Sequence, residues 1–255
     1  MHKQLRIALL LLILFIVAIG SWVTKMRSTD WSHTLRVAVY PINGDSSSQT
    51  ADYISRLNED DFDDIEAFFV EELHYYGIST EEPVKISLSA QVYEKPPPAP
   101  VDVSVLGIML WSLKLRYWAF QRNEYQGPKP EIQVFVLYFD PRTSPRLRHS
   151  LGLQKGLIGV VNVFADKKQS GSNHFIITHE ILHTLGASDK YAMQTNEPLY
   201  PHGYAEPDLQ PLYPQSFAEV MGGRIPVSAN KSKIPSSLYE VTVGEQTARE
   251  IRWIK

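Results

Sequence analysis

Apolar residues follow two different periods along the chain, and each period predicts a kind of element. Short runs rich in apolar and β-branched residues, bounded by turn residues, predict strands over residues 35–40, 84–92, 132–139 and 157–164. Three- and four-residue spacing predicts helices over 61–76 and 105–120, and a third helix with Ser172 or Asn173 as N-cap that ends at Gly186. Helices among strands predict a layered α/β (α+β) fold.

The helix predicted over 105–120 is the most apolar of the three, although it is too polar to span a bilayer. Its aromatic residues are Trp111, Tyr117, Trp118 and Phe120. Large aromatic side chains are mostly buried, so we expect these four in the core. The alternative is a lipid- or envelope-binding surface along this helix.

The longest apolar run of the chain lies at the N-terminus. Residues 7–23 contain only Gly20 and Ser21 as weak breaks, and Lys3 and Arg6 precede them. This arrangement predicts an export signal or a membrane anchor, in the form of one N-terminal hydrophobic helix. We therefore expect the rest of the chain to work outside the cytoplasm.

Cleavage and retention of this segment are both compatible with its sequence. Residues 18–20 fit a small-x-small cleavage site, which would give a secreted protein. Trp22 and the basic Lys25 resemble an interfacial belt, which favours a single-pass membrane protein. Residues 1–27 are assigned to this signal-anchor, and 28–255, about 228 residues, to one domain.

Charge and cysteine content narrow the chemistry of that domain. Twenty-five Lys and Arg against 28 Asp and Glu give a net charge of −3, so the chain lacks the basic excess expected for a nucleic-acid partner. The sequence has no cysteine, which excludes Cys-ligated zinc, iron–sulfur clusters, thiol catalysis and disulfides. A metal site would have to use His, Asp and Glu.

The third predicted helix carries such residues. His179 and His183 are four residues apart, so their imidazoles lie one turn apart on one helix face and can reach a single ion. Glu180 is placed to contact a water held by that ion. The surrounding residues are apolar, which argues against two surface histidines, because buried imidazoles without a partner are costly. Gly186 suits a left-handed C-cap, and Asp189, three residues on, can supply a third ligand.

The string His179-Glu180-x-x-His183-x-x-Gly186-x-x-Asp189 resembles the zinc signature of the metzincin metalloproteases, with Asp in place of the more usual third His. Met221 follows Asp189 by 32 residues, and two glycines after it suit a turn like the methionine turn beneath the metal of that clan. The resemblance is close over residues 172–224.

The resemblance implies a mixed twisted sheet with long helices, in which the motif helix forms the floor of a cleft. It also implies an irregular C-terminal subdomain, which residues 188–236 fit because they are rich in Pro, Gly, Tyr and Asn. The strand over 157–164 is the candidate for the strand that borders the cleft and pairs with an extended peptide.

Two features of the site have alternatives. The third ligand could instead be one of four other residues: Glu219, Glu197, His202 or Asp208. Many metzincins place a Tyr two residues after the turn methionine, where this chain has Gly223. Tyr191, Tyr204 and Tyr213 are the candidates for the missing phenol, which would stabilise the reaction intermediate.

The motif and the resemblance predict a zinc-dependent endopeptidase with one Zn²⁺ per chain. His179, His183 and Asp189 would hold the zinc, and Glu180 would be the general base. Its partners would be a peptide or protein substrate and the membrane through residues 7–23. The alternative is a membrane-tethered binding or structural module whose zinc only stabilises the fold.

Overall fold

A computed structural model describes residues 5–7, 11–12, 15, 28–100, 104–122 and 125–255 of the chain. Most of the N-terminal apolar run over 7–23 lies outside these residues. In the part of the chain that the structure describes, no helix combines the length and the apolar character needed to cross a membrane.

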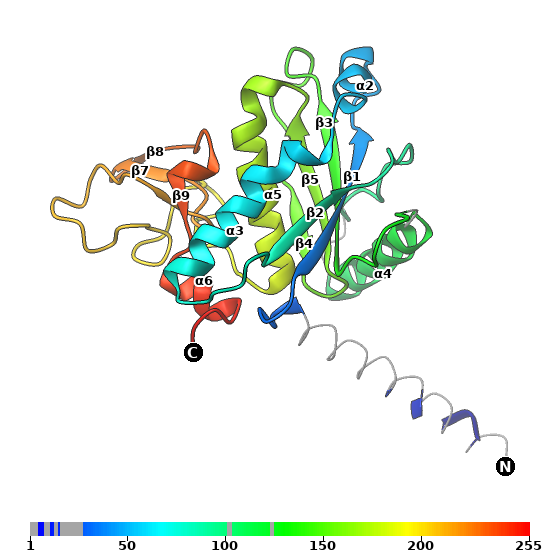
Figure 1. Cartoon of the computed structure of the whole chain (residues 1–255). Helices are drawn as coiled ribbons and strands as arrows, with labels where there is room; N and C mark the ends of the chain where they lie inside the picture. The colour runs from blue at the N-terminus through cyan, green and yellow to red at the C-terminus, as the bar shows by residue number, and fades with distance from the viewer. Residues whose placement is uncertain (1–4, 8–10, 13–14, 16–27, 101–103, 123–124) are drawn as a thin grey trace.

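A five-stranded mixed sheet forms the centre of the fold (Figure 1). Its strands are β1 (Leu35–Asn43), β2 (Val84–Leu88), β3 (Ile132–Phe139), β4 (Leu151–Leu153) and β5 (Ile158–Phe164), in the order β2-β1-β3-β5-β4. The first four strands in this order are parallel, and β4 is antiparallel to β5. Both faces of such a sheet must be covered, and β1, β3 and β5 accordingly consist mostly of buried residues.

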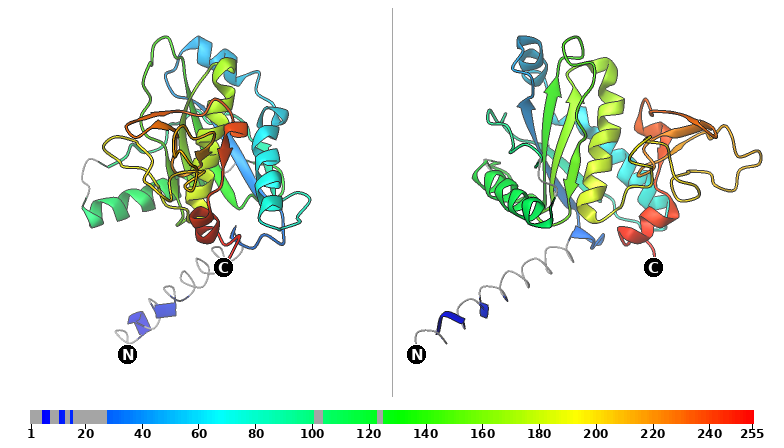
Figure 2. Two further views of the ribbon diagram at one scale, coloured as in Figure 1. Left: turned by 90° about the vertical axis from the view of Figure 1, so that its left-hand side faces the viewer. Right: turned by 180° about the vertical axis from the view of Figure 1, so that it is seen from behind.

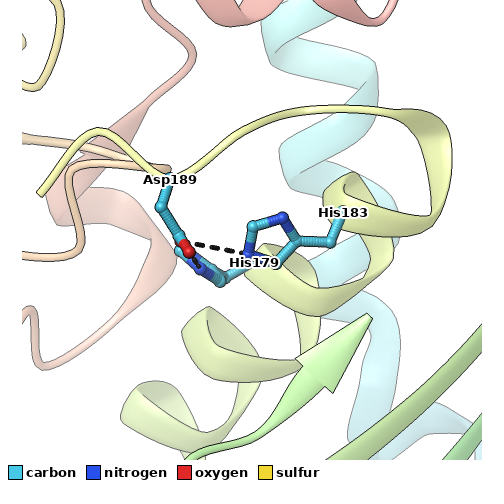
Figure 3. A group of neighbouring side chains, drawn as sticks. All are labelled: His179, His183 and Asp189. Carbon is cyan, nitrogen blue, oxygen red and sulfur yellow. Dashed lines mark hydrogen bonds and ion pairs between the residues drawn. The ribbon is translucent and has the colours of Figure 1, made fainter. Parts of the chain in front are cut away.

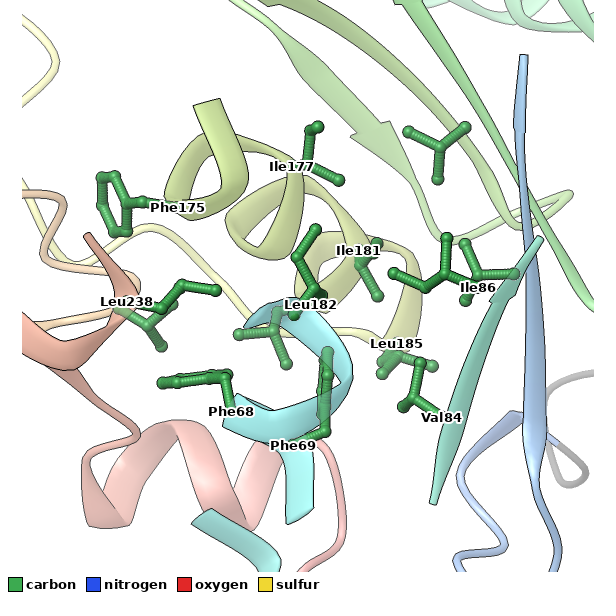
Figure 4. Packing of buried hydrophobic residues seen from close by; sticks show 14 of the residues in the cluster. Phe68, Phe69, Val84, Ile86, Phe175, Ile177, Ile181, Leu182, Leu185 and Leu238 are labelled. Atoms are coloured by element: carbon green, nitrogen blue, oxygen red, sulfur yellow. The ribbon is translucent and has the colours of Figure 1, made fainter. Parts of the chain in front are cut away.

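Helices cover the two faces of this sheet (Figure 2). On one face α3 (Asp63–Tyr75) and α5 (Ser170–Leu185) form the larger core with the sheet. Figure 4 shows how Phe68 and Phe69 of α3 pack near Leu182 of α5. On the other face α4 (Val105–Gln121) packs a smaller core through Leu115 and Trp118. The layered α/β class predicted from the apolar periods is confirmed.

The aromatic residues of α4 are only partly in the core. Trp118 is buried and Trp111 is partly buried, as predicted. Tyr117 and Phe120 are 64% and 77% exposed, so the prediction is wrong for them. The reason is geometric: α4 has apolar residues all round, and the sheet covers only one side of a helix.

The start of α5 also differs from the prediction. Neither Ser172 nor Asn173 is the N-cap, because a 3₁₀ turn, η2 (Lys167–Gln169), leads directly into α5 at Ser170. The Asp166 side chain caps that turn. Asn173 instead bonds the backbone of β5 at Phe164, so its side chain joins the helix to the sheet.

The edge strand next to β5 is β4, so β5 is not itself the edge of the sheet. The strand predicted to border the cleft, β5, lies between β3 and β4, but its end beyond the β4 pairing still lines the cavity described below through Asn162 and Phe164. The three residues of β4 are too few to show a strand period. The free edge of the sheet on this side therefore belongs to Leu151–Leu153.

The chain after α5 is irregular, as expected for residues 188–236, but it holds short elements. These are β6 (Ala218–Glu219), β7 (Ile225–Ser228), β8 (Lys231–Lys233), η3 (Leu238–Glu240), β9 (Val241–Thr242) and α6 (Glu245–Glu250). Earlier in the chain, α2 (Ser48–Ile54) and η1 (Glu59–Phe62) complete the elements. The pairing of β6 with β9 holds the segment around Met221 against the larger core.

Candidate metal centre

Helix α5 and the loop after it bring three ligand side chains together (Figure 3). His179 and His183 lie one turn apart, with ring centroids 4.7 Å apart. Their Nε2 atoms lie 3.2 and 3.0 Å from the same oxygen, Oδ1 of Asp189. One ligand atom from each of the three residues lies within 4.8 Å of the others, and the group is the only one of its kind among the described residues. The sequence prediction of this trio agrees with the geometry.

Backbone carbonyls orient both imidazoles. Nδ1 of His179 lies 2.8 Å from the carbonyl oxygen of Val220, and Nδ1 of His183 lies 2.8 Å from that of Ala187. A carbonyl oxygen only accepts, so Nδ1 of each ring carries the proton and donates it. In the neutral rings Nε2 is then left with a free lone pair that faces the centre, as a metal requires.

Gly186 returns the chain to the two histidines. Its φ of 111° is left-handed, and its N–H donates to the carbonyl oxygens of Leu182 and His183, which ends α5. This left-handed conformation is what requires glycine, because the atom nearest to a Cβ here, Nε2 of Gln154, is the end of a flexible side chain. The predicted C-cap is confirmed, and it lets the following loop present Ala187 and Asp189.

The segment around Met221 lies beneath His179. Val220 supplies the carbonyl for that histidine, and the carbonyl of the fully buried Met221 accepts from the backbone of Lys190. Gly223 is left-handed, with φ 78°. The segment thus connects one ligand to the loop that holds another, which is the supporting role that the resemblance implied for Met221.

Glu219, one of the alternative ligands, stabilises this turn instead. Its buried carboxylate accepts from the backbone N–H of Gly222 at 2.7 Å and of Gly244 at 3.2 Å, and from the hydroxyl of Thr247. Burial raises the pKa of Glu219, against these hydrogen bonds and Lys190, which lower it. The other three alternatives, Glu197, His202 and Asp208, also lie outside the ligand group.

Glu180 is placed beside the ligand group without belonging to it. The residue is buried, and its Oε2 has no hydrogen-bond partner. Burial raises the pKa of Glu180, while the neighbouring His179 and His183 lower it. A carboxylate that faces a cavity and has a raised pKa is suited to proton transfer near neutral pH.

That cavity has a volume of about 300 Å³ and runs beside the ligand group. Its walls come from α5 and the loop after it, from the segment before β4, from the end of β5 and from the Met221 turn, and include Arg148, His149, Asn162, Tyr191, Gly223 and Arg224. Larger hollows exist, but the 600 Å³ cavity around His174 contains no three-ligand group among the described residues. The chemistry therefore favours the smaller cavity.

Gly152 allows the edge strand β4 to lie directly on the motif helix. A Cβ at this position would lie 2.5 Å from the carbonyl oxygen of Glu180 and 2.5 Å from Cβ of His183. Only glycine permits such an approach. No sequence signal marks this residue, because its partners lie far along the chain.

Of the three candidate tyrosines, the structure brings Tyr191 to the site. Its ring centroid lies 6.2 Å from that of His179, and a Cβ at Gly223 would be 3.5 Å from its ring. Burial and the adjacent Asp189 raise the pKa of Tyr191 to about 12, so its phenol stays protonated and able to donate. Tyr204 and Tyr213 instead bond each other through their hydroxyls at 2.9 Å.

Helix α6 fastens the loop that carries Asp189. Glu250 accepts from the backbone and hydroxyl of Ser188 at 2.9 and 2.8 Å. It also pairs with Nζ of the buried Lys190 at 2.9 Å. The residues on both sides of Asp189 are therefore held by one carboxylate.

The donor set fits a divalent cation. Burial would raise the pKa of Asp189, but the neighbouring His179 and His183 outweigh burial and lower it, so the carboxylate is charged. Two imidazole nitrogens and one charged oxygen are ligands that Zn²⁺ accepts. The group has three protein ligands among the described residues, the number typical of catalytic zinc sites, whereas structural zinc sites usually have four.

A scan against protein-family models found no match, and a search of curated proteins found no similar protein. The assignment of a function therefore depends on the geometry of the site.

Proposed function

We propose that this protein is a zinc-dependent endopeptidase of the metzincin type. The observation that carries the proposal is the convergence of His179, His183 and Asp189 on one point beside the buried, unpartnered carboxylate of Glu180. The fold supports it, since a mixed sheet ends at an antiparallel edge strand that lies on the motif helix.

His179, His183 and Asp189 would hold the zinc. When bound there, zinc would lower the pKa of water and polarise the scissile carbonyl. Glu180 takes the proton from the attacking water and then passes it to the leaving amine. The raised pKa of Glu180 suits both steps, because the carboxyl has to accept and release a proton at the same pH.

Tyr191 is the proposed donor to the developing negative charge on the scissile carbonyl oxygen. It lies against Gly223, the position at which many metzincins have their phenol, so a residue from another segment supplies the missing group. A peptide would lie along β4, whose free edge offers backbone groups for an added strand.

The alternative, a zinc site that only stabilises the fold, is less well supported. Structural zinc sites usually have four protein ligands, and the ligand group in the described residues has three. A structural site would also give the buried Glu180 no reason to lack a hydrogen-bond partner.

Glu180→Gln is the test of this mechanism. The amide keeps the size of the side chain but has no basic oxygen for the proton. We expect zinc content to stay unchanged while hydrolysis of a diverse peptide mixture, followed by mass spectrometry, falls at least about a hundredfold. The control is Glu197→Gln, a glutamate outside the ligand group, which should cleave like the parent. Parental cleavage by Glu180→Gln would refute the mechanism.

A further inference from the structure

Helix α4 exposes a large apolar face. Seven of its apolar residues are more than half exposed: Val105, Leu106, Met109, Leu110, Leu113, Tyr117 and Phe120. Monomeric soluble proteins rarely expose contiguous apolar patches of this kind, and such patches usually mark a contact with a partner or a membrane.

The seven residues lie on one side of the helix. At 100° per residue they occupy an arc of about 140°, with Lys114 at one border. Leu115, Trp118 and Ala119 are on the opposite side and pack against the sheet. The exposed arc is therefore the part of α4 that the protein itself leaves uncovered.

The charges on α4 are all positive. The helix contains Lys114 and Arg116 and no acidic residue. Lys114 is exposed and Arg116 partly so. Lys114 borders the apolar arc and Arg116 falls within it at 100° per residue, and cations near a membrane surface are attracted to anionic lipids.

The N-terminal apolar run lies close in the sequence to the start of the domain. The apolar run over 7–23 is proposed to be a membrane element, and the domain begins at Ser28 and Thr29, which are buried. Trp31 follows, with its Nε1 donating to the carbonyl of Ile251 at 2.9 Å. The chain from Val23 to Ser28 spans at most about 17 Å. The domain therefore has no long stalk and would be held close to the membrane surface.

The figures place the beginning of the domain and α4 on the same side of the molecule. In all three views α4 flanks the lower part of the sheet, where the chain enters β1, and Figure 1 and the right view of Figure 2 show the segments after α5 across the sheet from α4. The exposed arc of α4 is therefore an apolar surface on the side of the domain at which residues 7–23 would attach it to the membrane.

We propose that the exposed face of α4 lies in the surface of the lipid bilayer, as a second membrane contact beside residues 7–23. This inference uses the membrane assignment of that run and is independent of protease activity. It implies that the metal centre, which is on the other face of the sheet, is directed away from the lipid.

Lipid quenching of single labels tests the proposal on the full chain. Because the chain has no cysteine, Leu113→Cys and Leu199→Cys each offer one site for an environment-sensitive fluorophore. The two leucines are 55% and 51% exposed and so form a matched pair, and Leu199 lies in the loop between α5 and β6. Both variants are reconstituted in phosphatidylcholine–phosphatidylglycerol vesicles with and without nitroxide-labelled lipid.

We expect severalfold quenching of the label at 113 and none at 199. Nitroxides near the headgroup should quench more than those at the chain end, because an interfacial helix lies only about 5–10 Å into the headgroup boundary. Phe120→Cys on the same arc should repeat the result. Equal signals at 113 and 199, or a chain that does not sediment with the vesicles, would overturn the proposal. A label at 113 that is shielded from water but not quenched by lipid would also overturn it and indicate a second copy of the chain.

Discussion

The two faces of the sheet differ in where polar and apolar side chains lie. On the α5 face, polar side chains lie inside an apolar core, and the imidazoles of His179 and His183 are each held by a backbone carbonyl. On the α4 face, apolar side chains lie outside, with Phe120 77% exposed. Buried polar groups and exposed apolar groups are both costly without a partner. We therefore propose a different partner for each face, a cation on the α5 face and lipid on the α4 face.

The α5 face depends most strongly on Asp189. Asp189→Ala removes the charged ligand and leaves two imidazoles, so we expect zinc to fall from about one per chain to nearly none. Elemental analysis of the purified protein measures this. His202→Ala, which removes an exposed histidine outside the ligand group, is the control and should keep its zinc. Full zinc in Asp189→Ala would move the third ligand elsewhere.

The approach of β4 to α5 gives the next largest effect. Gly152 and Gly159 are directly paired in the sheet, yet their surroundings differ. A Cβ at 152 would lie 2.5 Å from backbone and side-chain atoms of α5, whereas at 159 the nearest atom is 3.4 Å away. Gly152→Ala should lower the free energy of unfolding by about 2–3 kcal/mol, and Gly159→Ala by less than about 1 kcal/mol. Urea denaturation compares them, and equal losses would contradict the close packing.

The loop that carries Asp189 should lose stability when its carboxylate clamp is removed. Glu250→Gln leaves the buried Lys190 without its charged partner. At neutral pH we expect a loss of about 1–3 kcal/mol in the free energy of unfolding. Glu245→Gln, on the same helix but outside this clamp, should cost less than about 0.5 kcal/mol.

The pH dependence of this loss follows from the pKa of Glu250. Burial raises that pKa, but the hydrogen bonds from Lys190 and Ser188 outweigh it and the pKa is lowered. A lowered pKa in the folded state means that the stabilisation is present above the unfolded value of about 4.3 and is lost as the pH falls through the folded value. The difference between parent and Glu250→Gln should therefore shrink in acid, and a constant difference would contradict the ionic contribution.

Local sequence patterns were sufficient for much of the α5 face. The spacing of His179 and His183 predicts their common helix face, and Gly186 predicts the end of that helix. The strand over 132–139 was predicted at the bounds it has in the structure. These features depend on residues a few positions apart, which is the range in which periodicity and capping operate.

Features that depend on distant residues could not be predicted. Glu250 contacts Ser188 across 62 positions, and nothing in either neighbourhood marks the pair. Tyr191 was one of three equal candidates, because the contact of its ring with Gly223 is made by tertiary structure. The core prediction is wrong for Tyr117 and Phe120 of α4 because a helix that is apolar all round does not reveal which side the sheet will cover.

The smallest predicted effect comes from comparing an exposed and a buried leucine of α4. Leu113 is 55% exposed and Leu115 is fully buried, although they are two residues apart. Leu113→Gln keeps a side chain of similar length at a mostly exposed position, so the free energy of unfolding in lipid-free solution should change by less than about 0.5 kcal/mol. Leu115→Ala leaves a cavity under the sheet and should cost about 2–5 kcal/mol. Urea denaturation measures the free energy of unfolding of both variants. A comparable loss in Leu113→Gln would show that the protein itself covers this face, and the bilayer would no longer be needed to explain it.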